Sequence, residues 1–446
     1  MKKIVSFLFL VFWIIPLDSA RHKPTDPANL SSKGKQLRVK PTRAVSSSEV
    51  LLGIDVLEQS SFKILKGKRV GLLTNQAGVN RFKKSTIQVL FDSDKVKLVA
   101  LFAPEHGIDG RAKAQDSVAN TSHPATGLPV YSLYGPTRRP TAQMLKNIDV
   151  MVIDLQDIGV RSYTYISCLR YTMEACFENG VAVVVLDRPN PLGGLKVDGP
   201  VMDAQWMSYV GAYRIPYVHG LTIGELALMA KDISNSIPSV PSISSSVRRN
   251  GNLTVIPMKG WKRSMLWIDT GLSWIPTSPY IRDTSSIFGY AMIGLGCQIG
   301  GFHHGIGSFY PFRILTFQNK TPEDIISALK SKHIPGLAYQ KRPFNDSNGK
   351  RQEGVYVEIS DWNALRPTEI SFYLMQIAAQ WSSKNPFSQV SEDQMSLFNK
   401  HTGSNSWWKE ISSKGSLANV PYFISQWKSQ SSDFQKKSKK YWLYRE

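Results

Sequence analysis

The chain has 446 residues, which is too long for one small core and predicts two or three domains. Hydrophobic residues make up 42% of it, an ordinary share that excludes a largely disordered chain. Lysine and arginine number 54 against 34 aspartate and glutamate residues, so the formal net charge is +20. This excess predicts an anionic partner, which on charge alone is nucleic acid, a membrane surface or an acidic cell-wall polymer.

The first twenty residues have the pattern of a secretory signal. Two lysines precede an uncharged apolar stretch over residues 4–15, and small residues follow at positions 19 and 20. The apolar stretch is too short to be a good membrane span. We therefore predict a signal peptide over residues 1–20 and export to the periplasm or the extracellular space, with an uncleaved anchor as the second interpretation. Residues 21–48 are rich in Lys, Arg, Pro and Ser and predict a flexible basic linker.

From residue 51 onward, short apolar runs alternate with helical patterns. Strands are predicted over residues 69–74, 97–103, 149–153 and 181–186, and helices over residues 83–91, 162–178 and 222–233. Nearly continuous apolar strands separated by helices are typical of a parallel sheet that is covered on both faces. The sequence therefore predicts an α/β fold, with a Rossmann-like catalytic domain and a mostly parallel sheet over residues 49–235.

A stretch rich in Ser and Pro over residues 234–246 predicts a domain boundary. Beyond it the pattern is mixed, and we predict a smaller α+β C-terminal domain over residues 236–446. Its expected strands lie near residues 253–258, 312–317 and 354–359, and its expected helices over residues 322–330 and 368–381.

Several kinds of site are disfavoured by the motifs. The chain has no G-x-G-x-x-G after its first strand, no phosphate-binding P-loop pattern and no G-x-S-x-G nucleophile turn. Cys168 and Cys176 share one predicted helix, where they are expected to be buried apolar residues. His303 and His304 are adjacent, so they do not share a helix face, and no third ligand lies at a suitable spacing. We predict neither a metal nor an organic cofactor.

Polar residues follow three of the predicted strands of the first domain. They are Glu105 and His106, then Asp154 and Asp157, then Asp187 and Arg188. The carboxyl ends of parallel strands meet at one rim of a sheet, so we expect these side chains to converge. Crowded carboxylates suit a reaction that needs one protonated and one ionised carboxyl group. Glycoside hydrolysis is such a reaction, because an acid protonates the leaving oxygen while a second carboxylate attacks or activates water.

Each of these residues also has a structural interpretation. Asp154 and Asp157 are equally well explained as helix caps, because aspartate is a favoured cap residue. Glu105 favours the catalytic interpretation, because glutamate in a Pro-Glu-His-Gly turn has no strong capping preference. His106 is a second proton carrier or, more simply, orients the loop. Arg161 either clamps a substrate carboxylate or pairs with Asp157.

Six stretches carry a resemblance to a known family. They are GLLTNQAGV (71–79), LFAPEHGI (101–108), TGLPVYSLYGPTRRPT (126–141), IDLQDIGVRSYTYIS (153–167), LDRPNPLGG (186–194) and HGLTIGELA (219–227). With them the sequence resembles the NamZ-type exo-β-N-acetylmuramidases, a group long described as a domain of unknown function, from about residue 53 to residue 444. The resemblance implies a bacterial enzyme of cell-wall turnover that removes terminal N-acetylmuramic acid from the non-reducing end of peptidoglycan fragments, without a cofactor, in a cleft between two domains.

The resemblance also implies roles for single residues. Glu105 matches the glutamate of the family's Pro-Glu-His-Gly motif and is implied as the general acid, with Asp154 or Asp157 as the second carboxylate. The substrate's own acetamido group is an alternative nucleophile. The residues expected to bind the substrate are Asn75, Gln76, His106, Arg161, Tyr163, Asp187, Arg188 and Asn190.

One segment departs from the family pattern. Relatives carry a stretch resembling E-G-T-N-x-S-E-G-R-G-T before Pro-Phe-Glu, whereas residues 294–308 here read GLGCQIGGFHHGIGS and Arg313 follows Pro-Phe. His304 takes a glutamate position, and Ile306 takes that of the arginine. The change predicts an altered substrate, or a wall-binding protein that kept the fold and lost turnover. A nucleic-acid-binding protein explains the charge, but its basic residues are dispersed and no binding motif is present.

Overall fold

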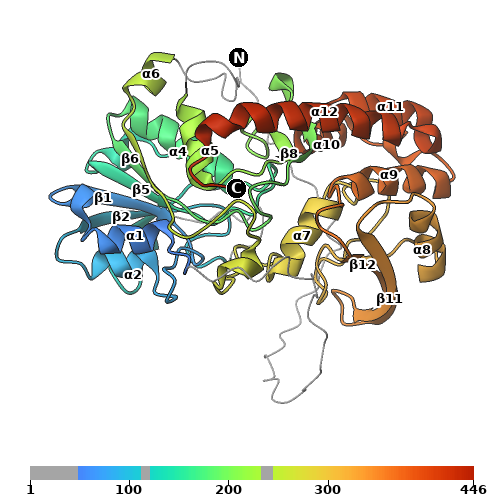
Figure 1. The fold of residues 1–446 in the computed structure, drawn as a ribbon, viewed down its shortest axis with the longest axis horizontal. Coiled ribbons are helices and arrows are strands. Elements are labelled where there is room, and N and C mark those ends of the chain that lie inside the picture. Colours follow the sequence, from blue (N-terminus) through green and yellow to red (C-terminus); the bar gives the residue numbers. More distant parts are fainter. Residues whose placement is uncertain (1–48, 112–120, 233–244) are drawn as a thin grey trace, which may run out of the picture.

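The computed structural model describes residues 49–111, 121–232 and 245–446. The predicted signal peptide and basic linker, and most of the Ser- and Pro-rich stretch at 234–246, lie outside these residues. Figure 1 shows two lobes: an α/β layer structure built mainly from the first half of the chain, and a second lobe that carries β11, β12 and α7 to α9. No helix in the described ranges is long and apolar enough to cross a membrane.

The first lobe is organised around a seven-stranded sheet with the order β3-β4-β2-β1-β5-β6-β9. Every neighbouring pair is parallel except β3 with β4, which is antiparallel. The predicted mostly parallel sheet is therefore confirmed. Its strands are β1 (Arg69–Thr74), β2 (Lys97–Ala103), β3 (Thr121–Ser122), β4 (Pro129–Ser132), β5 (Val150–Asp154), β6 (Ala182–Leu186) and β9 (Leu253–Ile256).

Helices cover both faces of this sheet, because successive strand residues point to opposite sides. Leu72 and Val152 pack with residues of α1 (Gly53–Gln59) and α2 (Thr86–Phe91) on one face. Leu73 and Ile153 pack with α4 (Tyr165–Glu178) and α5 (Ile223–Lys231) on the other. Short α3 (Ala142–Leu145) contributes Leu145 to the core on this second face, and short α6 (Ser245–Asn250) contacts α4. Cys168 and Cys176 are buried in α4, as predicted.

The second lobe contains a three-stranded antiparallel sheet with the order β10-β12-β11. Its strands are β10 (Ile314–Leu315), β11 (Leu337–Asn345) and β12 (Arg351–Ile359). Its helices are α7 (Thr284–Ile293), α8 (Pro322–Lys330), α9 (Glu369–Trp381), α10 (Glu392–Thr402), α11 (Ser406–Lys414) and α12 (Val420–Ser438). The α+β character predicted for this region agrees with this arrangement.

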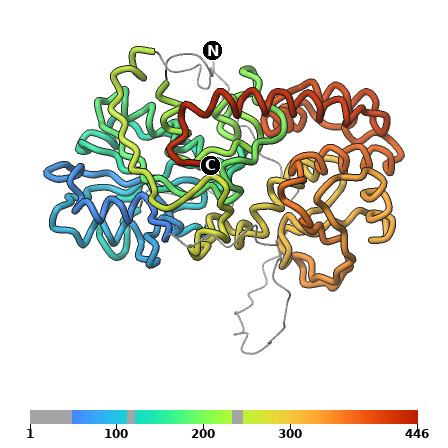
Figure 2. Tube along the Cα trace, viewed as in Figure 1, coloured from blue at the N-terminus to red at the C-terminus, as the bar shows by residue number. Residues whose placement is uncertain are grey.

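The division between the lobes differs from the predicted boundary at residues 235–236. Strand β9 lies beyond that point, yet it pairs in parallel with β6 as the last strand of the first sheet. Helix α12 returns from the second lobe and packs on the hairpin of β7 (Asp198–Val201) and β8 (Pro216–Val218), so that the C-terminus lies against the first lobe (Figure 2). The sequence predicts both segments in the second domain, because a sequence pattern indicates whether a segment is a strand or a helix but not which element it packs against.

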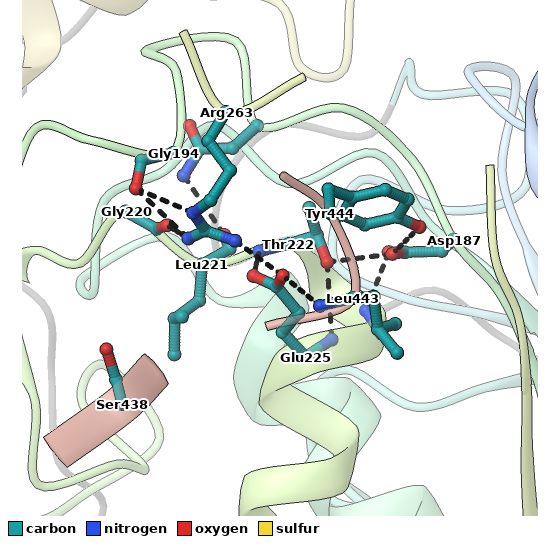
Figure 3. Close-up of polar contacts among 12 residues, drawn as sticks. Asp187, Gly194, Gly220, Leu221, Thr222, Glu225, Arg263, Ser438, Leu443 and Tyr444 are labelled. Atoms are coloured by element: carbon teal, nitrogen blue, oxygen red, sulfur yellow. Dashed lines mark hydrogen bonds and ion pairs between the residues drawn. The ribbon is translucent and has the colours of Figure 1, made fainter. Parts of the chain in front are cut away.

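Figure 3 shows where the C-terminal segment is attached to the first lobe. The Tyr444 hydroxyl donates to Asp187 Oδ2 (2.5 Å), and the Leu443 N–H donates to Glu225 Oε1 (2.9 Å). Arg263 is fully buried and forms an ion pair with Glu225 at 2.5 Å. The last residues of the chain therefore complete the polar cluster at the N-terminal end of α5.

Candidate active site

Glu105 follows β2 in the turn Pro104-Glu105-His106-Gly107. The turn is closed by the Gly107 N–H, which donates to the Pro104 carbonyl (3.1 Å), and His106 has a φ of +73°. This left-handed conformation is rare for a residue with a side chain, and such positions concentrate at functional sites. Glu105 is half-buried, and Thr164 at the start of α4 donates its hydroxyl proton to Oε2 (2.6 Å). Among the described residues Oε1 has no hydrogen-bond partner, so one oxygen is held and the other is open.

Buried tyrosines lie around this carboxylate. Burial raises the pKa of Tyr163, Tyr165 and Tyr209, and the negative charge of Glu105 adds to the effect. The same two causes raise the pKa of Tyr290 in α7 to about 12. All four phenols therefore stay neutral at physiological pH, and Glu105 faces a weakly polar, closed side of the site.

Asp154 ends β5 in the interior and not at the open rim. Its side chain is fully buried in a two-point ion pair with Arg188, with 2.5 Å from Nε to Oδ1 and 2.8 Å from Nη2 to Oδ2. The Thr86 hydroxyl also donates to Oδ2 (2.5 Å). In this conformation neither oxygen is open to a substrate, so the geometry favours the structural interpretation of both Asp154 and Arg188.

Asp157 is also buried, and its partner is a residue that the sequence analysis did not single out. Oδ2 accepts the Gly159 N–H (2.8 Å) and lies 3.2 Å from His219 Nε2. The Leu221 N–H donates to His219 Nδ1 (3.2 Å), so a neutral ring carries its proton on Nε2, facing the carboxylate. Asp157 Oδ1 is buried without a partner in the described structure. Asp157 is thus the only one of the predicted aspartates with an unused oxygen.

Asp187 and Asn190, predicted to bind substrate, hold loops together. Asp187 is fully buried and accepts from the Thr222 hydroxyl (2.8 Å), the Gly224 N–H (2.7 Å) and Tyr444, which fixes the start of α5 (Figure 3). The Asn190 amide donates to the Leu221 carbonyl (3.0 Å). Because these partners are backbone groups or buried side chains, the geometry favours a positioning role for both residues.

Asn75, Gln76 and Tyr163 contact one loop. Gln76 donates to the Pro276 carbonyl (2.7 Å), and the Tyr163 hydroxyl donates to Thr277 Oγ1 (2.7 Å). Asn75 reaches the same loop through Tyr165, to whose hydroxyl it donates at 2.6 Å. The loop at residues 276–277 therefore covers the end of β1, and these predicted substrate ligands hold it there.

Arg161 neither pairs with Asp157 nor faces solvent. Its side chain is fully buried, and it donates to four backbone carbonyls: those of Pro200 (3.4 Å), Ile215 (3.2 Å), His401 (2.9 Å) and Thr402 (2.9 Å). Burial lowers its pKa only to about 10, so the guanidinium stays charged. Since two of the carbonyls end α10, Arg161 fastens the second lobe to the first in this conformation.

The crevice that α/β sheets of this kind normally use for ligands lies between β1 and β5, where the strand order reverses. Here Trp267 and Trp274 line a cavity of about 20 Å³, together with Ala77, Gln156 and Arg188. That volume suits a water molecule and no sugar. Glu105 lies one strand away, after β2, and is not among the residues that line this cavity.

The second lobe reaches the surroundings of Glu105 through Tyr290. The Tyr290 hydroxyl lies 3.1 Å from Ser162 Oγ, and its ring packs edge-on against Phe312 with centroids 5.0 Å apart. Phe312 in turn packs against His304 at 4.9 Å. Burial, and then the neighbouring His303, lowers the pKa of His304 to about 4, so its ring is neutral at pH 7. The segment predicted to depart from the family pattern therefore adjoins the site.

Arg313, predicted to replace a glutamate of the family pattern, is buried in the core of the second lobe. It donates to the Val357 carbonyl (2.8 Å) and to Ser285 Oγ (2.9 Å). Its guanidinium also stacks on Tyr356, 4.6 Å from the ring centre. No cluster of three or more His, Cys, Asp or Glu side chains within the described ranges is arranged to hold a metal ion.

The predicted site residues thus divide into two groups. Glu105 and His106 lie at the rim beside Tyr163, and the contact of Gln76 with Pro276 is exposed, whereas the other predicted residues make their contacts inside the protein. Thr164, His219 and Tyr290 were missed, because each acts through a partner that is remote in the sequence. Fold and site together define a two-domain α/β protein in which, of the predicted catalytic carboxylates, Glu105 alone lies at the rim after a parallel strand.

Comparison with known proteins identifies the family. The model of the N-terminal domain of the exo-β-N-acetylmuramidase NamZ matches residues 70–285, and that of the C-terminal domain matches residues 288–444. The chain belongs to the NamZ family. It is 37% identical over 404 residues to the peptidoglycan β-N-acetylmuramidase NamZ of Bacillus subtilis strain 168, covering 89% of this chain and 92% of that protein.

Two solved structures share the fold. Both are DUF1343 family proteins from Bacteroides fragilis NCTC 9343. The first is 39% identical to this chain, and the match covers 89% of this chain and 99% of that protein, with a TM-score of 0.79. The second is 27% identical, covers 90% and 100%, and has a TM-score of 0.68. The two-domain architecture is therefore shared across the full length of these relatives.

Proposed function

We propose that the protein is an exo-acting β-N-acetylmuramidase that releases terminal N-acetylmuramic acid from the non-reducing end of peptidoglycan fragments. The observation that carries this proposal is Glu105, the one predicted catalytic carboxylate at the rim with an oxygen open to a ligand. The similarity to the Bacillus subtilis enzyme over most of both chains supports the same activity.

Glu105 is the general acid in this proposal. The Thr164 hydroxyl holds Oε2, so that the proton on Oε1 is directed to the glycosidic oxygen of the substrate. Transfer of that proton allows the bond between C1 and the oxygen to break, and the remaining chain leaves as an alcohol. The resulting carboxylate then accepts a proton from the attacking water, which returns Glu105 to its starting state.

The second catalytic group is the acetamido group of the substrate in this proposal. Asp154 is neutralised by Arg188, and Asp157 is buried beside His219, so neither offers an open carboxylate for attack at C1. The acetamido oxygen attacks C1 from the opposite face, and water opens the cyclic intermediate, which gives net retention of configuration. NMR spectroscopy of early product should therefore show the β-anomer of N-acetylmuramic acid. The α-anomer as first product would refute this assignment.

Sugar release from a defined N-acetylmuramic acid–N-acetylglucosamine disaccharide tests the function. The parent protein should release N-acetylmuramic acid, and Glu105→Gln should lose roughly 10²- to 10⁴-fold in kcat. Glu178→Gln is the control, because this glutamate pairs with Arg139 at the surface of the same lobe. If the parent protein binds wall fragments as tightly as Glu105→Gln does and releases no sugar, the protein is instead a wall-binding protein.

We also propose that the protein is exported and works on the cell wall outside the cytoplasm. The support is the charge and apolar pattern of residues 1–20 and the +20 net charge, which favours anionic wall or membrane surfaces. N-terminal sequencing of the protein from the extracytoplasmic fraction should find a chain that begins after about residue 20. Recovery of the full-length chain only from the cytoplasm would contradict export.

A further inference from the structure

Residues 304–312 form a closed loop in the second lobe. The Phe312 N–H donates to the His304 carbonyl (2.7 Å), so the two ends of the loop lie side by side. Phe312 has a φ of +59°, an uncommon conformation for an aromatic residue. The Ser308 hydroxyl donates to the Gly305 carbonyl (2.7 Å) inside the loop. Compact loops with pinned ends are frequently functional, and this one is held in a fixed shape.

The loop carries an aromatic surface that runs outward from the site. At its inner end Phe312 packs on Tyr290, whose hydroxyl reaches Ser162. At its outer end Phe309 is 80% exposed and packs edge-on against Tyr310 at 5.2 Å. Tyr310 packs in the same way on Tyr356 of β12 at 5.4 Å. The rings are thus arranged between the surroundings of Glu105 and open solvent.

Arg342 places a positive charge beside this surface. Residues 294–313 contain no aspartate or glutamate. The guanidinium of Arg342 lies 3.9 Å from the ring centre of Tyr356 and 5.9 Å from that of Tyr310. Within the described structure it pairs with no carboxylate, and its side-chain partner is Gln340 (3.0 Å). An anionic ligand lying on the rings therefore meets a cation that no carboxylate neutralises.

An exo-acting enzyme encloses the terminal sugar and leaves the rest of the polymer outside. Of the tyrosines around Glu105, Tyr163, Tyr165 and Tyr209 are buried and form the closed side, whereas Phe309 is exposed on the open side. Aromatic rings offer a large flat apolar surface to a ligand at little cost in conformational entropy. The muramic acid units of the polymer carry carboxylates, which Arg342 complements.

We propose that residues 304–312 and Arg342 form the subsite for the sugars beyond the cleaved bond, with Phe309 stacking on a ring of the departing chain. This inference rests on the proposed function, because it names the part of the same substrate that the loop binds. It also gives the segment that departs from the family pattern a role in selecting the length of the chain.

The test compares Phe309→Ala with Phe82→Ala, a matched control whose ring is 78% exposed on the loop after β1. Each is assayed on an aryl N-acetylmuramide, which has no second sugar, and on a muramic acid–glucosamine tetrasaccharide. Phe309→Ala should raise KM for the tetrasaccharide roughly three- to tenfold, with kcat unchanged. The KM of Phe309→Ala for the aryl glycoside should equal that of the parent. Phe82→Ala should have the KM of the parent for both substrates.

An unchanged KM of Phe309→Ala for the tetrasaccharide would overturn the subsite, as would an equal rise for the aryl glycoside or in the Phe82→Ala control. A parent that hydrolyses neither substrate would overturn the proposed function. Calorimetric binding of the tetrasaccharide then decides the subsite separately. Weaker binding to Phe309→Ala than to the parent supports it, and equal binding, or no binding to the parent, refutes it.

Discussion

Replacement of Arg161 by methionine distinguishes a fastening residue from a substrate clamp. Methionine keeps much of the length and apolar volume of the side chain but removes every donor. The four carbonyls that Arg161 now satisfies would be left in the interior, and those of His401 and Thr402 lose the shortest bonds, both 2.9 Å. Gly403 packs directly on the guanidinium, because any Cβ there would lie 2.5 Å from Arg161 Nη1.

The expected loss of stability follows from these bonds. A hydrogen bond to a charged donor contributes about 1.5–3 kcal/mol, so the two short bonds together amount to about 3–6 kcal/mol. The entropy of unfolding for a chain of this size is about 0.8 kcal/mol per degree, so the melting temperature should fall by about 4–8 °C. The two longer bonds, at 3.2 and 3.4 Å, add to this loss and are left out of the estimate.

Scanning calorimetry measures the melting temperature, and KM is measured at a temperature where the variant is still folded. Arg139→Met is the control, because Arg139 pairs with Glu178 at the surface with both side chains about 40% exposed. Its loss should stay below about 1 kcal/mol. An Arg161→Met protein with the melting temperature of the parent and a KM raised tenfold or more would refute the fastening role and restore the substrate clamp.

Three further predictions concern buried polar groups. Asp154→Asn leaves Arg188 buried without its counter-charge. Denaturant titrations should show that the free energy of unfolding falls by about 3–5 kcal/mol. A fall of less than about 1 kcal/mol would contradict the ion pair. Tyr444→Phe removes the donor to Asp187 and should lower the free energy of unfolding by about 1–3 kcal/mol. An unchanged free energy of unfolding would show that the C-terminal segment is not anchored there. Burial raises the pKa of Glu225 from 4.5 to about 7, so the folded state binds more protons between these values and this group's contribution to stability falls as pH rises from about 4.5 to 7. The melting temperature of the parent minus that of Glu225→Gln should therefore decrease across that window, and a constant difference would refute the shift.

Most of the fold could be predicted because its signals are local. The strands β1 and β2 match the predicted ranges residue for residue, since each is an apolar run bounded by polar residues. Helix α5 begins within a residue of the predicted range 222–233, because Thr222 and Glu225 form a capping box at its start. The partners of β9 and α12 could not be predicted in this way. Pairing of β9 with β6 and packing of α12 on β7 are contacts between segments far apart in the sequence, and no local pattern encodes them.

Only the outline of the site could be predicted. A residue that directly follows a parallel strand is expected at the rim of the sheet, but its position in the sequence does not indicate its partners there. Whether a rim residue is open depends on what the rest of the chain brings to it. Arg188 neutralises Asp154, and His219 is placed beside Asp157. Arg161 is covered by α10, which lies some 240 residues further along the chain. Each of these contacts depends on the tertiary structure alone.

The same contacts constrain the chemistry. Glu105 was expected to share the catalytic work with Asp154 or Asp157, but the ion pair at Asp154 and the burial of Asp157 leave Glu105 as the one of these three carboxylates with an oxygen available at the rim. A glycosidase with a single available carboxylate needs its nucleophile from elsewhere, and a 2-acetamido sugar carries one in the right place. Such an enzyme would select its substrate by that acetamido group, because a sugar without it could be protonated by Glu105 but not attacked at C1.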